Sequence, residues 1–197
     1  MRYLSLLSAL AATALAQTPP GSSPSTNKNF GVAFPNATVT PGTWVTPDDL
    51  TSQPAIYVTE NLNKDATYMV VMLDLNIPDS DVTTTAASYD TLVPGLAVNT
   101  TTRLHWWGGN YTIQNGRFVN SSDAISEYTA PRPRDSTNHT YTLYLFNQPE
   151  GYVPFEEAAN GTYYSQTAFA RFNFTLDPIL KAVGGPVAAN YFLSDEI

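Results

Sequence analysis

Two histidines and one aspartate are the residues of this chain whose types and positions could carry binding chemistry. His105 and His139 each stand beside an apolar segment, and Asp74 directly follows the apolar residues 68–73. Imidazoles and a phenol such as Tyr141 can donate hydrogen bonds to a phosphate or carboxylate, and a carboxylate can fix an imidazole tautomer. Each residue taken alone is more typical of a structural role. Taken together, they predict a site that binds a small anion.

The motif content argues against catalysis. The chain has no Cys, no Gly-x-Ser-x-Gly motif and no His-Glu-x-x-His motif, so the familiar nucleophile and zinc-protease signatures are missing. We therefore expect a protein that is not an enzyme and uses no cofactor. An acid hydrolase using Asp74 and a histidine stays as an alternative. Asp74 and the two histidines could in principle hold a divalent metal, but we predict no metal site.

Composition limits the class of partner. The formal charge is −8 and the sequence pI is near 4.5, so neither nucleic acid nor an anionic membrane surface is expected to attract this chain. An apolar content of 43% with 12% aromatic residues is enough to bury a core, which predicts one folded domain. No apolar run after residue 16 approaches 18 residues, so we predict no transmembrane segment.

The N-terminus has the features of a targeting segment. Arg2 precedes an apolar stretch that ends in the small-x-small sequence Ala14, Leu15, Ala16, so residues 1–16 are predicted to be a signal peptide. We therefore expect a secreted, extracellular protein. Glycosylation is expected at the seven Asn-x-Ser/Thr acceptors, which are Asn36, Asn99, Asn110, Asn120, Asn138, Asn160 and Asn173.

The remaining chain is predicted to consist of a short leader and one mostly β domain. Residues 17–31 are rich in Pro, Ser, Thr and Asn and are predicted to be flexible, and residues 32–197 are predicted to form the domain. Turn clusters separate short β-rich segments, which predict strands at 39–45, 55–60, 68–73, 104–107, 141–146 and 167–174. In the last of these, Phe172 and Phe174 should face inward, and Arg171 and Asn173 outward. Short helices are expected at 155–159 and 178–183.

Five short motifs follow one another along residues 74–192. In this order they resemble the phosphatidylethanolamine-binding protein family, and a match of all five by accident is improbable. They are Asp74-Leu75-Asn76-Ile77-Pro78, Leu104-His105-Trp106, Tyr128-Thr129-Ala130-Pro131-Arg132-Pro133, His139-Thr140-Tyr141 leading to Gln148, and Gly185-Pro186-Val187-Ala188-Ala189-Asn190-Tyr191-Phe192.

The resemblance implies a central antiparallel sheet, a smaller second sheet, a few short helices and a small anion pocket at one end of the large sheet. It implies no catalytic residue. Because His139 and Tyr141 are two residues apart, they should share one face of a strand. Carried over position by position, the ligand-binding residues are Asp74, Asn76, Pro78, His105, Pro131, His139 and Tyr141.

Three departures from the family pattern concern this pocket. Asn76 stands where the family usually has a second aspartate, which removes a negative charge, and Thr140 replaces the usual arginine. The segment between Pro78 and His105 leaves the family's pocket tyrosine unassigned, with Tyr89 as a candidate replacement.

Trp106 and Trp107 allow two interpretations. They could form an aromatic shelf beside the pocket, or they could belong to the core, which is the more typical role of such residues.

The sequence thus favours a secreted, non-catalytic binding protein that takes a phosphate or a phospholipid head group. The alternative is an inhibitor of a serine carboxypeptidase or another protease, since the family contains such inhibitors and an acidic glycoprotein with a flexible N-terminal arm would suit one. A cytosolic kinase partner does not fit a secreted chain.

Overall fold

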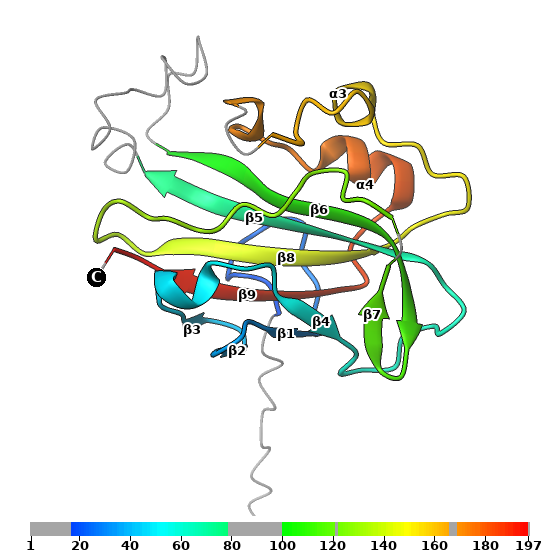
Figure 1. Cartoon of the computed structure of the whole chain (residues 1–197), viewed down its shortest axis with the longest axis horizontal. Helices are drawn as coiled ribbons and strands as arrows, with labels where there is room; N and C mark the ends of the chain where they lie inside the picture. The colour runs from blue at the N-terminus through cyan, green and yellow to red at the C-terminus, as the bar shows by residue number, and fades with distance from the viewer. Residues whose placement is uncertain (1–16, 79–99, 121, 166–168, 197) are drawn as a thin grey trace, which may run out of the picture.

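The computed structural model describes residues 17–78, 100–120, 122–165 and 169–196. Within these ranges the chain forms three layers: short helices, a large sheet and a smaller sheet (Figure 1). The predicted signal peptide, Tyr89 and the acceptor Asn99 lie outside the described residues. No helix among the described residues is long and apolar enough to cross a membrane.

The described strands form one connected sheet in the order β2-β1-β4-β7-β6-β5-β8-β9-β3. The long strand β6 joins its two parts, because its first residues pair with β5 and its last three with β7. All strand pairs are antiparallel except β3 with β9. The predicted mostly β fold is confirmed. The strands are β1 (Gly31–Ala33), β2 (Thr38–Val39), β3 (Thr43–Trp44), β4 (Ala55–Tyr57), β5 (Tyr68–Pro78), β6 (Thr100–Gln114), β7 (Arg117–Val119), β8 (His139–Asn147) and β9 (Ala188–Ser194).

Two short α-helices, α3 (Glu156–Ala159) and α4 (Asp177–Val183), lie on one side of the large sheet (Figure 1). Both helices are at the positions predicted from the sequence. α4 has Pro178 in its first turn, and Gly184 follows its last residue with φ +83°, a left-handed conformation that favours glycine. Two 3-10 helices, η1 (Pro47–Leu50) and η2 (Phe169–Arg171), complete the helical segments of the described residues.

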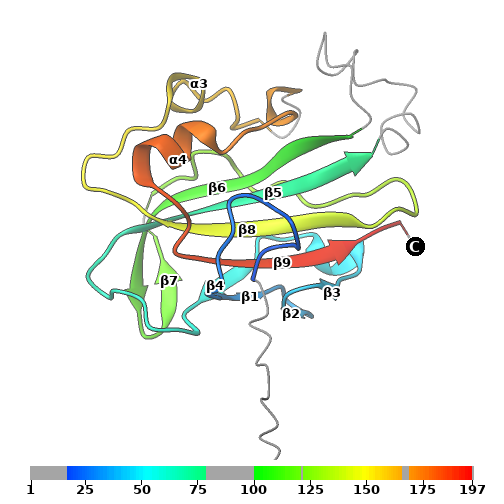
Figure 2. The same ribbon diagram turned by 180° about the vertical axis from the view of Figure 1, so that it is seen from behind.

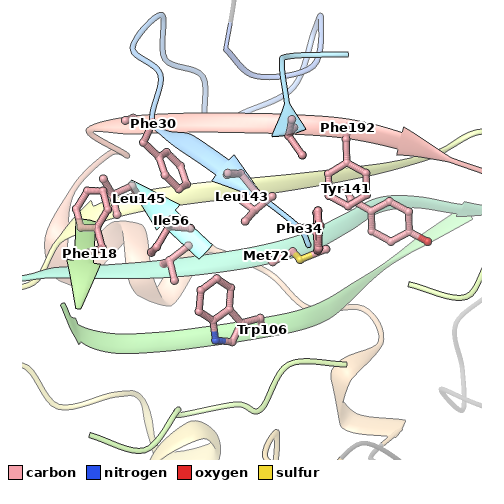
Figure 3. Close-up of a cluster of buried hydrophobic side chains, with 14 of the residues drawn as sticks. Phe30, Phe34, Ile56, Met72, Trp106, Phe118, Tyr141, Leu143, Leu145 and Phe192 are labelled. Atoms are coloured by element: carbon pink, nitrogen blue, oxygen red, sulfur yellow. The ribbon is translucent and has the colours of Figure 1, made fainter. Parts of the chain in front are cut away.

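Strand β5 is covered on both faces, as its apolar residues on both faces predict. Val70 and Met72 belong to a core between the large sheet and strands β1, β2, β4 and β7 (Figure 3). Met69 and Val71 belong to a second core beneath α3 and α4. Strand β8 alternates in the same way, so these two strands form the rigid centre that positions the candidate site.

The predicted strand at residues 39–45 is wrong, because the chain turns in its middle. Pro41 and Gly42 separate β2, which pairs with β1, from β3, which pairs with β9 at the other end of the strand order. Gly42 has φ +81° and donates its N–H to the carbonyl of Tyr191. A proline and a left-handed glycine thus end one strand and direct the chain to the opposite edge.

The predicted strand at residues 167–174 is also wrong. Its described part contains η2, and only Phe172 forms an isolated bridge, to Arg103. Phe174 is buried and Asn173 exposed, as alternation predicted, but Arg171 is 0% exposed instead of facing outward. The guanidinium is held inside by backbone carbonyls, an arrangement that a hydropathy pattern does not reveal.

Residues 17–31 pack against the domain, which differs from the predicted flexible leader. Thr18 is 1% exposed and Phe30 is fully buried. Asn29 bridges Ala189 of β9, and the Ala189 N–H donates to the carbonyl of Lys28. Seen from behind, this segment loops across the large sheet (Figure 2). The packed structure therefore begins before Val32.

Candidate functional site

A buried pair of side chains, Asp74 and His139, forms the centre of the candidate site. Asp74 lies near the end of β5 opposite Tyr141, and His139 begins β8. The His139 Nδ1 and the Asp74 Oδ2 are 2.6 Å apart, and the two residues are 2% and 1% exposed. The other carboxylate oxygen of Asp74 accepts the backbone N–H of Asn76. The carboxylate therefore fixes the orientation of the imidazole and places a proton on Nδ1.

A second carboxylate approaches the other side of the same imidazole. Asp135 Oδ1 lies 3.6 Å from the His139 Nε2. The same Asp135 oxygen accepts hydrogen bonds from the backbone N–H and the hydroxyl of Thr137, which hold it in place. Carboxylates on both sides of one ring stabilise a positive charge on it.

A bulge in β6 places His105 on the same face as Asp74 and His139. Pairing with β5 jumps from Trp106 opposite Met72 to Leu104 opposite Leu73, so His105 is the extra residue. Regular alternation would put His105 and Trp106 on opposite faces. The bulge instead lets Trp106 pack in the first core while His105 contacts Tyr141, with ring centroids 5.2 Å apart.

The hydrogen-bonding role of His105 differs from the sequence expectation. Its Nδ1 lies 2.8 Å from the carbonyl oxygen of Thr129, and a carbonyl only accepts, so Nδ1 carries the proton. Burial, aided by the positive charge of Arg103, holds the pKa of His105 well below 6.5. The ring is therefore neutral and its Nε2 is an acceptor. The expectation that both imidazoles donate to an anion is wrong for His105.

This buried neutral histidine predicts a pH-dependent stability. The unfolded chain takes up a proton at His105 near pH 6.5 and the folded chain does not, so the free energy of unfolding should fall as pH decreases below about 6.5. The slope from this one group approaches about 1.4 kcal/mol per pH unit. Urea denaturation at pH 7.5, 6.5, 5.5 and 5.0 should give a shallower decline for His105→Gln than for the wild-type protein. Parallel declines for the two proteins would contradict the assignment of a neutral His105.

Arg103 is a site residue that the sequence analysis missed. It is the cross-strand partner of Asp74, so the two side chains leave the sheet on the same face. Its guanidinium carbon lies 5.4 Å from the centre of the Phe172 ring, in cation–π geometry. A signal was present in the sequence, because Arg103 stands two residues before His105 and directly before the strand predicted at residues 104–107.

Tyr141 contacts both histidine rings, whereas Asn76, Pro78 and Pro131 are placed less centrally. Tyr141 stacks on Phe192 at 5.1 Å, and Figure 3 shows its hydroxyl pointing away from the other labelled side chains. Asn76 is exposed, and its backbone N–H donates to Asp74. Pro78 is half-buried at the end of β5, and Pro131 is buried two residues beyond Thr129. The structure thus brings together Asp74, His105, His139 and Tyr141.

Trp106 and Trp107 are core residues. Both are 0% exposed, and they pack in the two different cores on opposite faces of the sheet. The core interpretation is therefore confirmed, and an aromatic shelf is not formed. Within the described ranges, no three His, Asp or Glu side chains are grouped in a way that could hold a metal ion.

The family is decided by a comparison of the whole chain with protein-family models. The model for the phosphatidylethanolamine-binding protein matches residues 25–190. This chain belongs to that family. The phomoidride biosynthesis cluster protein N of Talaromyces stipitatus is 30% identical to it over an alignment of 207 positions, which covers 94% of this chain and 93% of that protein.

Solved structures of the family share the fold at lower identity. A carboxypeptidase Y inhibitor, crystallised with its cognate proteinase, has a TM-score of 0.59 and 17% identity, covering 88% of this chain and 85% of that one. A phosphatidylethanolamine-binding protein from Plasmodium falciparum has a TM-score of 0.51 and 15% identity, covering 89% and 91%. At such identities the likeness establishes the fold of this family member and leaves its ligand to be argued from its own residues.

Proposed function

We propose that this family member is a non-catalytic binding protein that holds a small oxyanion, a phosphate or a phospholipid head group, at Asp74, His139, Tyr141 and Arg103. The observation that carries the proposal is the buried hydrogen bond between His139 Nδ1 and Asp74 Oδ2. It fixes an imidazole at the end of the sheet, with the carboxylate of Asp135 3.6 Å from the other ring nitrogen. Arg103 adds a permanent positive charge on the same face.

The neutral His105 narrows the ligand class. Since its Nδ1–H is bonded to Thr129, the remaining ring nitrogen can only accept a hydrogen bond. A ligand oxygen that meets it must carry a hydrogen. A singly protonated phosphate monoester has such an oxygen and also acceptors for His139 and Arg103, whereas a phosphodiester has no O–H. We therefore expect monoesters to bind more tightly than diesters.

The central test is the replacement of His139. His139→Ala should weaken the binding of phosphoethanolamine by about 10- to 100-fold, which corresponds to about 1.5–3 kcal/mol for a hydrogen bond to a charged group. Calorimetric titration at constant ionic strength measures the affinity. Lys181→Ala, which removes a charge from an exposed position on α4, should change the affinity by less than twofold. Equal affinity of wild type and His139→Ala would exclude an anion site at these residues.

Secretion is part of the proposal and rests on the sequence. The features of residues 1–16 and the seven glycosylation acceptors support export of a glycoprotein. Five of the acceptors, Asn36, Asn110, Asn138, Asn160 and Asn173, are exposed. Mass spectrometry of the protein from its natural source should find an N-terminus near Gln17 and glycans on exposed acceptors. An intact Met1 with bare acceptors would refute this part alone.

Inhibition of a serine carboxypeptidase is the second candidate, favoured by the likeness to a carboxypeptidase Y inhibitor. The packing of Thr18 and Phe30 against the domain argues against a free N-terminal arm as the inhibitory segment. An assay of carboxypeptidase Y with increasing amounts of this protein separates the two candidates. Stoichiometric inhibition that survives His139→Ala would favour the inhibitor.

A biosynthetic context is suggested by the name of the relative from Talaromyces stipitatus. A protein that only holds an acidic compound could serve beside biosynthetic enzymes, because binding needs no nucleophile. The phosphate titration therefore includes acetate as a carboxylate arm, and tighter binding of acetate than of phosphoethanolamine would favour this context.

A further inference from the structure

A cavity lies apart from the residues of the proposed anion site. Its volume is about 500 Å³, within the size range of small-molecule sites. It lies between the chain at residues 51–53, the segment 122–128 and Tyr164, with Trp106 and Tyr111 at its base. Neither Asp74, His105, His139 nor Tyr141 is among its described lining residues.

The charged groups around this cavity are all negative. Asp123 and Glu127 line it, whereas no Lys, Arg or His is found among its described lining residues. Glu127 lies beside the Tyr164 hydroxyl, and its negative charge, together with that of Asp123, raises the pKa of Tyr164. The two carboxylates therefore act on the same region of the cavity mouth, and they favour a cation there.

Aromatic rings make up much of the wall. The Tyr128 hydroxyl donates to the carbonyl of Leu50, and Tyr111 lines the cavity together with Gln53. Trp106 packs edge-on against Tyr111 at 6.1 Å. Aromatic walls next to carboxylates are the combination that recognises organic ammonium ions, since ring faces attract a cation that is too large and apolar to be well hydrated.

The wall that carries the carboxylate is held rigidly. The buried Arg171 donates to the backbone carbonyls of Glu127 at 2.8 Å and Tyr164 at 2.6 Å, so one guanidinium joins two segments of the cavity wall. Ser126 adds a pair of backbone hydrogen bonds to Trp107 of β6. A wall fixed before binding reduces the entropy lost when a ligand is held.

The base of the cavity contains an unsatisfied donor. Trp106 is 0% exposed, and its Nε1–H has no hydrogen-bond partner within the described part of the chain. Figure 3 shows this nitrogen on the side of the ring turned away from Met72 and Ile56. A buried donor without a partner is uncommon, and a water held beside a bound ligand would accept its hydrogen bond.

A smaller and more apolar cavity of about 310 Å³ adjoins the first. The two share Gln53, Trp106, Tyr111 and Asn120, and the smaller one extends along Ile56 and Phe118 of strands β4 and β7. Arg117 also lines the smaller cavity, so the ammonium group is expected at the end that holds Glu127 and Asp123, and the uncharged end of the ligand in the smaller cavity. An elongated ligand can therefore place its charged end near Glu127 and an apolar group against the small sheet.

We propose that these joined cavities form a second binding site, which takes a small organic ammonium compound with an apolar substituent. The ammonium group binds between Glu127, Asp123 and the ring of Tyr164. The apolar group lies in the adjoining cavity over Trp106 and Phe118. The site is independent of the proposed anion site, although both depend on segment 126–129, which pairs with β6 through Ser126 and Thr129.

The test uses three probes of one shape and different charge: phenethylamine, 2-phenylethanol and phenylacetate. NMR titration of the full chain should show phenethylamine shifting the Trp106 indole N–H and the Glu127 and Tyr128 backbone N–H signals. The alcohol and the acid should bind at least tenfold more weakly. Binding of 2-phenylethanol within twofold of the amine would overturn the proposal.

Substitutions identify which carboxylate binds the ammonium group. Glu127→Gln keeps the shape and a partner for Tyr164 and should weaken phenethylamine binding at least tenfold. The exposed Asp123→Asn should weaken it two- to threefold and provides a second variant if Glu127→Gln folds poorly. Glu156→Gln on α3, the same change on the other side of the large sheet, should have no effect.

The proposals for the two sites can be refuted separately. His139→Ala should leave phenethylamine binding unchanged, so loss of phosphoethanolamine binding alone concerns only the anion site. Unchanged phenethylamine affinity in both Glu127→Gln and Asp123→Asn, or signal shifts confined to residues 139–141, would refute the ammonium site.

Discussion

Arg171→Met is expected to lower the free energy of unfolding by about 3–5 kcal/mol, because it removes a buried charged donor and leaves its acceptors without partners. Arg171 is 0% exposed, and its guanidinium donates to the carbonyls of Ser165 at 2.8 Å, Glu127 at 2.8 Å and Tyr164 at 2.6 Å. Methionine fills much of the volume and satisfies none of these oxygens. Burial lowers the pKa of Arg171 to about 10, so the group is still charged at neutral pH.

The measurement is urea denaturation of both proteins at pH 7.5, followed by tryptophan fluorescence. Arg132→Met serves as the matched control, since Arg132 is exposed and its loss should change stability by less than about 0.5 kcal/mol. Arg171→Lys keeps the charge but not the planar set of donors, so it should recover only part of the loss. A loss below about 1 kcal/mol in Arg171→Met would show that these carbonyls are satisfied in another way.

Arg171 also shows where interpretation of the sequence fails. Alternation of Phe172 and Phe174 with Arg171 and Asn173 has the period of a strand, and a charge in such a pattern is normally exposed. The chain instead adopts a 3-10 turn at η2 and buries the charge against carbonyls from two other segments. Those acceptors are 44 and 7 residues away in the sequence, so no local pattern could identify them.

The central strands could be predicted because burial on both faces leaves a local record. Residues 68–73 and 141–146 are apolar at nearly every position, and β5 and β8 contain them in full. Both strands continue farther than predicted. The extensions include the polar residues Asp74 and His139, which a search for apolar residues leaves out. These two side chains are buried because they bind each other. The short strands β1 and β7 have three residues each, too few for a periodic pattern to identify.

The site was only partly accessible from the sequence. Residue types and motif order identified Asp74, His105, His139 and Tyr141, which the structure brings to one face. The acceptor role of His105 could not be foreseen, because it depends on the Thr129 carbonyl and on the bulge in β6. Arg103 was overlooked because the strand was predicted to begin at residue 104, whereas β6 begins at Thr100 and pairs Arg103 with Asp74.

Asp74→Ala is expected to have the second large effect, a loss of about 3–5 kcal/mol in the free energy of unfolding at pH 7. The substitution leaves the His139 imidazole, 2% exposed, without the carboxylate 2.6 Å from its Nδ1. It also removes the acceptor of the Asn76 backbone N–H. Asp65→Ala, at an exposed position before β5, is the control and should cost less than about 0.5 kcal/mol.

A double-mutant cycle separates the pair from its surroundings. Once Asp74 is absent, His139 no longer has the partner that orients it, so His139→Ala should cost much less in the Asp74→Ala background than in the wild-type protein. The coupling energy should be about 1–3 kcal/mol. Additive effects of the two substitutions would show that the short contact between Nδ1 and Oδ2 contributes no net stability.

The same double-mutant cycle, measured by phosphoethanolamine affinity, should also be non-additive, because Asp74 acts on the ligand only through the imidazole that it holds. This geometry requires that Asp74→Ala and His139→Ala lose the same affinity. It also requires that the double variant lose no more than either.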